Sequence, residues 1–121
     1  ASTFPGFCEK HDSEMFAKVE GTTFASDIQS AFLLSLRSLA MEKFNKYASI
    51  KFFEQARAYD AGAAFSNQAQ WQSFIAAALL GQRAALDDLE YWKCRFDDAY
   101  KSNDLSSFRC LICEFDRPLP K

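Results

Sequence analysis

Apolar residues recur at spacings of three and four over two long stretches of the chain, which is the period of an amphipathic α-helix. In the first stretch they fall at Ile28, Phe32, Leu36, Leu39 and Tyr47. Ser26 and Gln29 stand at the positions of a capping box just before this pattern. We therefore predict a helix over about residues 26–60. Residues 60–63 predict its end, because Gly62 tolerates the left-handed conformation that closes many helices.

The second stretch is the more regular one, with alternating spacings of four and three. Its positions are Trp71, Ile75, Ala78, Gln82, Ala85, Leu89, Trp92, Phe96 and Ala99. This pattern predicts a helix over about residues 67–102. Because only a short linker separates the two helices, we expect them to pack antiparallel, with aromatic side chains against alanines. Gly81 costs about 1 kcal/mol relative to alanine inside a helix, so we expect it to mark a close approach between the two helices, in preference to a slight bend.

Shorter elements are predicted at both ends. Asp12 or Ser13 is expected to cap a short helix that continues to about Glu20. The β-branched and aromatic run Phe108–Phe115 predicts one strand. Because a solitary strand leaves backbone groups unpaired, its partner would be Thr3–Phe7, another subunit or sequence outside this chain. The predicted fold class is mainly α, a long antiparallel helical hairpin with a short N-terminal helix and a C-terminal strand.

The composition is typical of a globular domain. Of 121 residues, 49% are hydrophobic and 25% charged, so residues 1–121 are expected to form a single helical domain. The start at Ala1 leaves open that the sequence is a fragment of a longer protein. A net charge of −2, with acids and bases interspersed, makes nucleic acid an unexpected partner. We expect no membrane span, since no apolar run approaches about 20 residues. The cysteine pattern is unlike a secreted disulfide scaffold and favours a cytoplasmic location.

Soft metal ligands form two close pairs, one near each end of the chain. They are Cys8 with His11, the single histidine, and Cys110 with Cys113. Cysteine sulfur and histidine nitrogen are the ligands of tetrahedral zinc sites, so these four residues are the candidate metal ligands. Two observations weigh against a closed site. An odd separation within a regular strand would send Cys110 and Cys113 to opposite faces, and free cysteines often serve as small apolar residues. Zinc is therefore an open cofactor hypothesis, and we expect the isolated chain to be metal-free.

The residues around Cys8 form a longer motif. It consists of Gly6-Phe7-Cys8, His11-Asp12, Met15-Phe16 and Val19-Glu20, with Phe32-Leu33-Leu34 further on. This motif resembles that of an uncharacterised bacterial protein family with the pattern Gly-Phe-Cys-x-x-His-Asp-x-x-Leu-Phe-x-x-Ile-Glu, followed by a long helix containing Phe-Leu-Leu. The resemblance covers about the first third of the chain, and its distinctive part is Cys-x-x-His-Asp. It implies that Cys8 and His11 supply half of a zinc site completed by upstream cysteines of a longer protein. It implies no settled activity.

Other chemistries have weaker support in the sequence. Cys8 and His11 have the residue types of a nucleophile and its base, but side chains three apart on a loop seldom hold that geometry, so we expect no catalytic residue. A small-molecule pocket with aromatic walls is a further hypothesis. Its residues would be Phe52, Phe53, Trp71 and Trp92.

From these observations we expect a non-catalytic structural or protein-interaction module. It would form a homo-oligomer or pack against further segments of a longer chain. The alternative is part of a zinc-dependent, nuclease-like enzyme whose metal centre is completed outside this chain.

Overall fold

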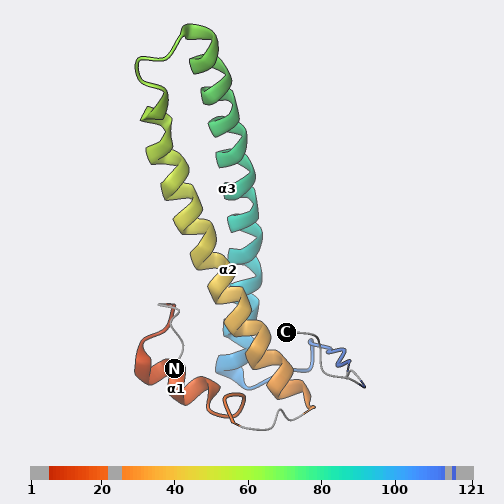
Figure 1. Ribbon diagram of the computed structural model, residues 1–121. Helices are drawn as coiled ribbons and strands as arrows, with labels where there is room; N and C mark the ends of the chain where they lie inside the picture. Colours follow the sequence, from red (N-terminus) through yellow and green to blue (C-terminus); the bar gives the residue numbers. More distant parts are fainter. Residues whose placement is uncertain (1–5, 22–25, 114–115, 117–121) are drawn as a thin grey trace.

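The computed structural model describes residues 6–21, 26–113 and 116. Its elements are α1 (Glu9–Phe16), α2 (Ile28–Ala56), the 3-10 helix η1 (Arg57–Asp60) and α3 (Phe65–Ser102). α2 and α3 form a long antiparallel hairpin, and α1 lies against it at the end far from η1 (Figure 1). We call the end with α1 the base and the end with η1 the tip. The mainly helical class, the hairpin and the short N-terminal helix are confirmed.

One stripe of α3 faces α2, and it differs from the predicted seam. Ile75, Leu79 and Leu86 are buried on α3, at the spacings of four and seven that a two-helix seam requires. Trp92 was predicted on the seam, yet it is 50% exposed. It follows Trp71 by three heptads and so shares that residue's place at the edge of the stripe. The smaller leucines occupy the centre because two close helices leave no room there for an indole ring.

The hairpin has an apolar cluster at each end. The base cluster comprises Phe16, Phe32, Leu33, Leu36 and Ala99, surrounded by Phe7, Met15, Val19, Phe96, Leu105 and Phe108. The tip cluster comprises Ala56, Ile75 and Leu79, with Ile50, Phe53 and Trp71 against it. Between them the stripe is partly polar, since Lys43, Lys46 and Gln82 are half-buried there. Two separate apolar clusters therefore hold the hairpin.

The N-cap residue of α2 lies one position later than predicted. Asp27, rather than Ser26, is the N-cap residue, and its Oδ1 accepts a hydrogen bond of 2.7 Å from the Ser30 backbone N–H. Lys18 Nζ lies 2.9 Å from the other carboxylate oxygen. The Ser30 bond and then the lysine lower the pKa of Asp27 from its usual 3.8 to about 2. The predicted capping box, with Ser26 as the N-cap, is therefore wrong. Asp27 takes this position because its carboxylate can accept from the helix N-terminus and pair with Lys18 at the same time.

The turn at the tip has the predicted glycine. α2 ends at Ala56, η1 continues to Asp60, and Gly62 adopts a φ of 82°. The Ala63 N–H donates to the Asp60 carbonyl at 3.0 Å, which closes the turn. A positive φ is strained for residues with a Cβ, so the glycine has a conformational role here.

Gly81 does not lie at a helix contact. A Cβ placed on this residue would meet no described atom within 4 Å, and the residue is exposed. The predicted close approach of the helices at Gly81 is therefore wrong. The seam is built from the leucine positions on another side of α3, so Gly81 presents bare backbone at the surface.

The predicted C-terminal strand is also wrong. Within the described residues the structure contains no strand, and residues 108–113 form an extended segment without a ladder partner. Residues 114–115 of the predicted strand, and Thr3 to Pro5 of its proposed partner, lie outside the described residues. The aromatic residue Phe108 instead packs against the two long helices. Its ring lies 5.1 Å from that of Phe32 and 4.8 Å from that of Phe96.

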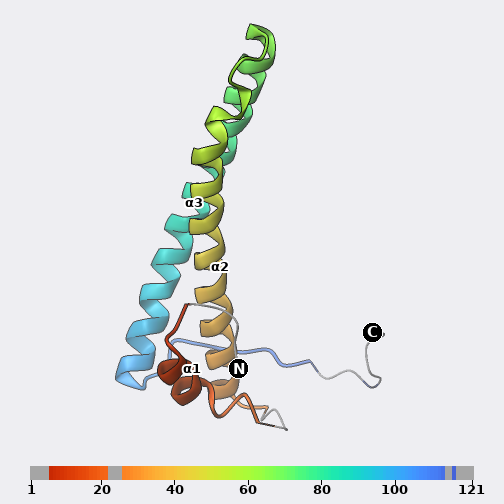
Figure 2. The same cartoon turned by 60° about the vertical axis from the view of Figure 1, so that its left-hand side comes forward.

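α1 and the extended segment 108–113 lie on opposite sides of α2 at the base (Figures 1 and 2). Toward the tip only α2 and α3 remain side by side (Figure 2). Among the described residues, no helix combines the length and the apolar character that crossing a membrane requires. The hairpin therefore projects from a base at which α1, α2, α3 and the extended segment 108–113 meet.

Candidate functional site

Cys8 and His11 meet at the start of α1. Cys8 is the N-cap residue, with φ −70° and ψ 155°, and the Asp12 N–H donates to its carbonyl at 2.8 Å. Its Sγ lies 3.0 Å from His11 Nδ1, and both residues are exposed. The predicted cap at Asp12 or Ser13 is wrong, because the helix starts at Glu9. Cys8 and His11 therefore share the first turn of a helix instead of lying on a loop.

Asp12 has a structural role that explains why it does not cap the helix. It is 7% exposed, and its Oδ2 accepts a hydrogen bond of 2.8 Å from Arg37 Nη2 of α2. The same guanidinium lies 2.7 Å from a Glu20 carboxylate oxygen and 4.9 Å from the centre of the Phe16 ring. Asp12 Oδ1 is buried and has no hydrogen-bond partner among the described residues. Arg37 thus joins α1 to α2 through charge and ring contacts together.

An aromatic contact also fixes the residue before Cys8. The Phe7 ring packs edge-on against Phe16 at 5.3 Å, with 65° between the ring planes. Phe16 is fully buried in the base cluster. The backbone is therefore held on both sides of Cys8, by Phe7 before it and by α1 after it.

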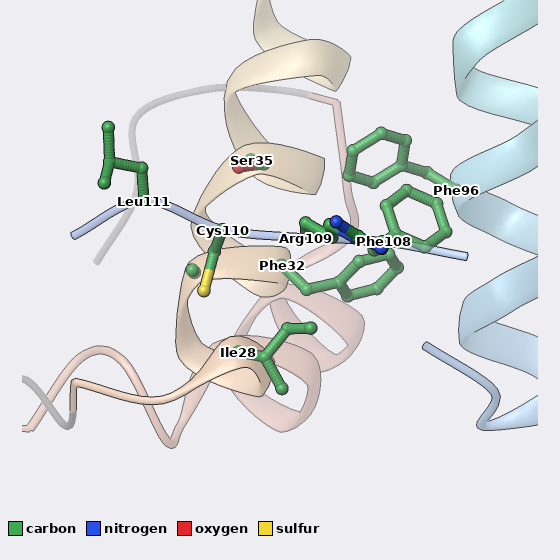
Figure 3. A pocket seen from close by; sticks show the side chains of 9 residues that line it. Ile28, Phe32, Ser35, Phe96, Phe108, Arg109, Cys110 and Leu111 are labelled. Atoms are coloured by element: carbon green, nitrogen blue, oxygen red, sulfur yellow. The ribbon is translucent and has the colours of Figure 1, made fainter. Parts of the chain in front are cut away.

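Cys110 and Cys113 lie on the extended segment, across α2 from α1. Figure 3 shows Cys110 in front of α2 beside a pocket of about 240 Å³. The stacked rings of Phe32 and Phe96, 5.0 Å apart, form one wall together with Phe108. Both cysteines are exposed, and all four cysteines of the chain are free thiols.

The four predicted metal ligands are only partly brought together. The structure unites Cys8 and His11, whereas the described part of the chain holds no group of three or more His, Cys, Asp or Glu side chains arranged to bind a metal. Two ligands alone do not make a structural zinc site, which uses four. A site containing all of Cys8, His11, Cys110 and Cys113 stays a prediction, and it would require the two sides of α2 to contribute to one ion.

Aromatic side chains gather near the tip on one face of the hairpin. Phe53 lies 5.5 Å from Phe52 and 6.3 Å from Phe74, and Phe74 lies 5.8 Å from Trp71. The Trp71 indole N–H donates to the Ala56 carbonyl at 2.8 Å. Phe52 and Phe74 are 52% and 55% exposed. Three of the four residues of the hypothetical aromatic pocket thus meet here, but as an exposed surface.

The fourth residue of that hypothesis, Trp92, lies further down α3. The rise of 1.5 Å per residue places it roughly 30 Å from Trp71 along the helix. Trp92 packs against Tyr91 at 5.2 Å, and the Arg95 guanidinium lies 5.9 Å from the Trp92 ring. Both aromatic residues are at least half exposed. One aromatic pocket that includes Phe52 and Trp92 is therefore ruled out by their separation, and two aromatic groups exist in its place.

The other face of the hairpin is polar and has its own partners. Arg83 contacts Glu54 at 2.8 Å, and the Tyr47 hydroxyl donates to Glu90. The hydrogen bond to Glu90 raises the pKa of Tyr47 above its usual 10.0. Arg83 follows Phe74 by two and a half turns, which places it on the opposite side of α3. The two faces therefore differ: ion pairs and hydrogen bonds link α2 to α3 on one face, and exposed aromatic side chains lie on the other.

Comparison with protein-family models, with curated proteins and with solved structures gives no match for this chain. The resemblance based on the Cys8 and His11 motif therefore stays a hypothesis.

Sequence reasoning missed Arg37 and the aromatic face, although each leaves a signal. Arg37 is the single charged residue between Phe32 and Met41, and a charge inside such a stretch indicates a partly buried partner. Phe74 and Tyr91 are large and apolar but lie outside the seam pattern. Large apolar residues outside the buried stripe are the sequence signal of a second contact surface.

Proposed function

We propose that this chain is a non-catalytic protein-interaction module whose hairpin associates with a second copy of itself. The observation that carries the proposal is the exposure of Phe52, Phe74 and Trp92, with Tyr91 packed beside Trp92. We call this surface, together with the small residues between its two aromatic groups, the aromatic face. Exposed aromatic groups on one face are typical of protein contact surfaces.

Three small side chains and one acid, Asp88, separate the two aromatic groups along α3. Ala77, Gly81 and Ala84 of α3 are exposed and lie between Phe74 and Tyr91. The bare surface at Gly81 meets nothing within the described part of the hairpin. Small residues let the backbone of another helix approach closely. This explains the glycine better than a contact inside the hairpin does.

A second copy suits this arrangement because a two-fold interface must be self-complementary. If two hairpins cross antiparallel at Gly81, the tip group of each meets the Tyr91 and Trp92 group of the other. Arg95 of one copy would then face the tip aromatics of its partner, a favourable position for a cation beside a ring. The assembly would be a four-helix bundle made from two hairpins.

The test compares two alanines of α3 by sedimentation equilibrium. Ala84 lies one turn after Gly81 on the aromatic face, whereas Ala76 lies one heptad before Arg83 on the polar face. We expect the parent to dimerise and Ala84→Glu to raise the dimer Kd at least about tenfold, the equivalent of 1.4 kcal/mol. Ala76→Glu should leave the Kd unchanged. A parent that stays monomeric at high micromolar concentration, or an equal effect of both variants, would refute self-association through this face.

A second candidate function rests on the convergence of Cys8 and His11. We propose as the alternative that the pair is half of a zinc centre in a zinc-dependent enzyme, completed by residues outside this chain. Exposure of both side chains supports it, since an outside ligand would have access. Elemental analysis of the isolated chain should then give no stoichiometric zinc, and a longer chain containing the completing ligands should carry about one zinc per molecule.

We further propose a cytoplasmic location. Its support is the presence of four free thiols, because paired cysteines prevail in oxidising compartments.

A further inference from the structure

The pocket between α2, α3 and the extended segment 108–113 has aromatic walls, and we call it the base pocket. Phe32 of α2 and Phe96 of α3 stack with 12° between their ring planes, and Phe108 lies edge-on to both, at 82° and 71°. Figure 3 shows the three rings gathered at one end of the pocket. Phe96 and Phe108 are only half-buried. The base pocket shares no residue with the aromatic pocket predicted from the sequence.

One side of α2 forms the floor of the base pocket. Ile28, Phe32 and Ser35 follow one another at spacings of four and three, which places them on one side of the helix. The extended segment 108–113 crosses that side (Figure 3). Ala31 lines the pocket as well, and its methyl group leaves open a space that a longer side chain would fill. The pocket is therefore a small apolar space bordered by side chains from three parts of the chain.

Arg109 is the single charged residue among the described residues that line the base pocket. Its guanidinium makes no ion pair, hydrogen bond or ring contact with any described residue, whereas Arg37 and Arg83 both pair with acids. A guanidinium pairs well with a carboxylate, because two parallel N–H groups can donate to its two oxygens. Arg109 is exposed. A carboxylate bound to it would therefore lie at the mouth of the pocket, with the apolar part of the same molecule inside.

We infer that the base pocket binds a small aromatic carboxylate. The ring of this ligand packs against Phe32, Phe96 and Phe108, since aromatic rings favour stacked and edge-on contacts with one another. Its carboxylate pairs with Arg109. The volume of about 240 Å³ is below the roughly 300 Å³ at which pockets for drug-sized ligands begin. The pocket therefore suits a molecule with one ring rather than a nucleotide. A neutral ligand would lack the ion pair, and a cationic one would be repelled by Arg109.

This inference is independent of self-association through the aromatic face. That face extends from Tyr91 to the tip, whereas the base pocket is lined by the first two turns of α2, Phe96 and residues 108–111. Ala84→Glu, which should weaken the dimer, should leave the affinity for the ligand within about twofold. A chain that binds the ligand but stays monomeric would refute only the dimer. A chain that dimerises but does not bind the ligand would refute only the base pocket.

The experiment titrates the isotope-labelled chain with phenylacetate and follows the backbone amide signals by NMR. Phenylacetamide is the matched probe, because it has the same shape without the charge. We expect saturable shifts near residues 28–35, 96 and 108–111, with a Kd of about 1 mM for a ligand of about ten non-hydrogen atoms. Phenylacetamide should bind at least about fivefold more weakly. Shifts that do not saturate by about 20 mM, equal affinities of the two probes, or shifts centred on the tip would overturn the inference.

Two variants separate the role of the charge from that of the space. Arg109→Gln should weaken phenylacetate binding about fivefold, whereas Arg57→Gln, at an exposed arginine of the tip, should change it by less than about twofold. Ala31→Leu should fill the pocket and weaken both probes at least about fivefold, with Ala76→Leu on the polar face as its control. The amide spectrum of each variant shows whether the fold is retained. Unchanged binding in Arg109→Gln would refute recognition of the carboxylate, and unchanged binding in Ala31→Leu would place the ligand outside the base pocket.

Discussion

Arg37 Nη2 and Asp12 Oδ2 are 2.8 Å apart and connect the middle of α1 to α2. Only one oxygen of the Asp12 carboxylate has a partner among the described residues, although the residue is 7% exposed. A buried carboxylate with a single cation depends strongly on that cation, because few other groups replace its lost hydration. The attachment of α1 to the hairpin therefore depends on Arg37 as well as on Phe16.

Replacing Arg37 should destabilise the protein more than an ordinary surface change. We expect Arg37→Met to cost about 3 kcal/mol, since it leaves Asp12 buried without its cation. Chemical denaturation measures the loss. The double variant Arg37→Met with Asp12→Asn should recover a large part of it, because the uncompensated charge is then gone. If the double variant were less stable than Arg37→Met alone, the electrostatic explanation would be wrong.

Two adjacent leucines of α3 provide a test of the seam. Leu79 is 1% exposed and Leu80 is 73% exposed. We expect Leu79→Ala to lower the free energy of unfolding by about 2 to 5 kcal/mol and Leu80→Ala to change it by less than about 0.5 kcal/mol. Trp92→Ala, at a half-exposed position, should fall nearer to Leu80→Ala. Equal losses for the two leucines in urea titrations would show that α3 is rotated from the orientation described.

Replacing Gly81 should stabilise the monomer. A Cβ there meets no described atom within 4 Å, and the residue lies inside α3. Gly81→Ala should therefore raise the free energy of unfolding by about 0.5 to 1 kcal/mol through the higher helix propensity of alanine. The measurement is thermal or chemical unfolding at a protein concentration below the dimer Kd. A loss of stability under those conditions would indicate an intramolecular contact at Gly81.

Asp27 should make the stability of the protein decrease at acidic pH. Folding lowers its pKa from 3.8 to about 2, so the folded state favours the ionised carboxylate. The resulting stabilisation is complete above pH 3.8 and is lost as the pH falls toward 2. The stability difference between the parent and Asp27→Asn should therefore shrink over this range, as measured by urea unfolding at a series of pH values. A difference that is independent of pH would contradict the role of the charge.

The hairpin was predictable because the sequence pattern that specifies each helix is local and repeats along it. Apolar positions at helical spacing identify both long helices, and Gly62 marks the turn between them. The rotation of α3 was harder, since Trp92 and Leu79 both fit an apolar stripe and only packing against α2 separates them. The strand prediction for residues 108–113 failed because a β-branched and aromatic run is equally suited to lying extended across a helix pair.

The candidate site was predictable in its residue types but not in its geometry. The spacing of Cys8 and His11 indicated a pair, yet the helix start was placed too late. Asp12 was assigned to the cap because its true partner, Arg37, is distant in the sequence. Such long-range pairs leave little trace in one sequence. Cys110 and Cys8 lie on opposite sides of α2. Their separation depends on the side of α2 on which each terminal segment packs, and no local sequence pattern specifies that side.

The position of the turn at the tip has a consequence for the order of folding. Ala56 and Ile75 of the tip cluster are near neighbours in sequence across η1, whereas Phe32 and Phe96 at the base are separated by almost the whole hairpin. Closing the short loop costs less chain entropy than closing the long one. The tip cluster is therefore expected to form first and the base cluster last. Phe16 would then pack against a hairpin whose two helices have already paired, starting from the turn. Gly62, which belongs to neither cluster, would then influence the folding rate more than any residue of the base.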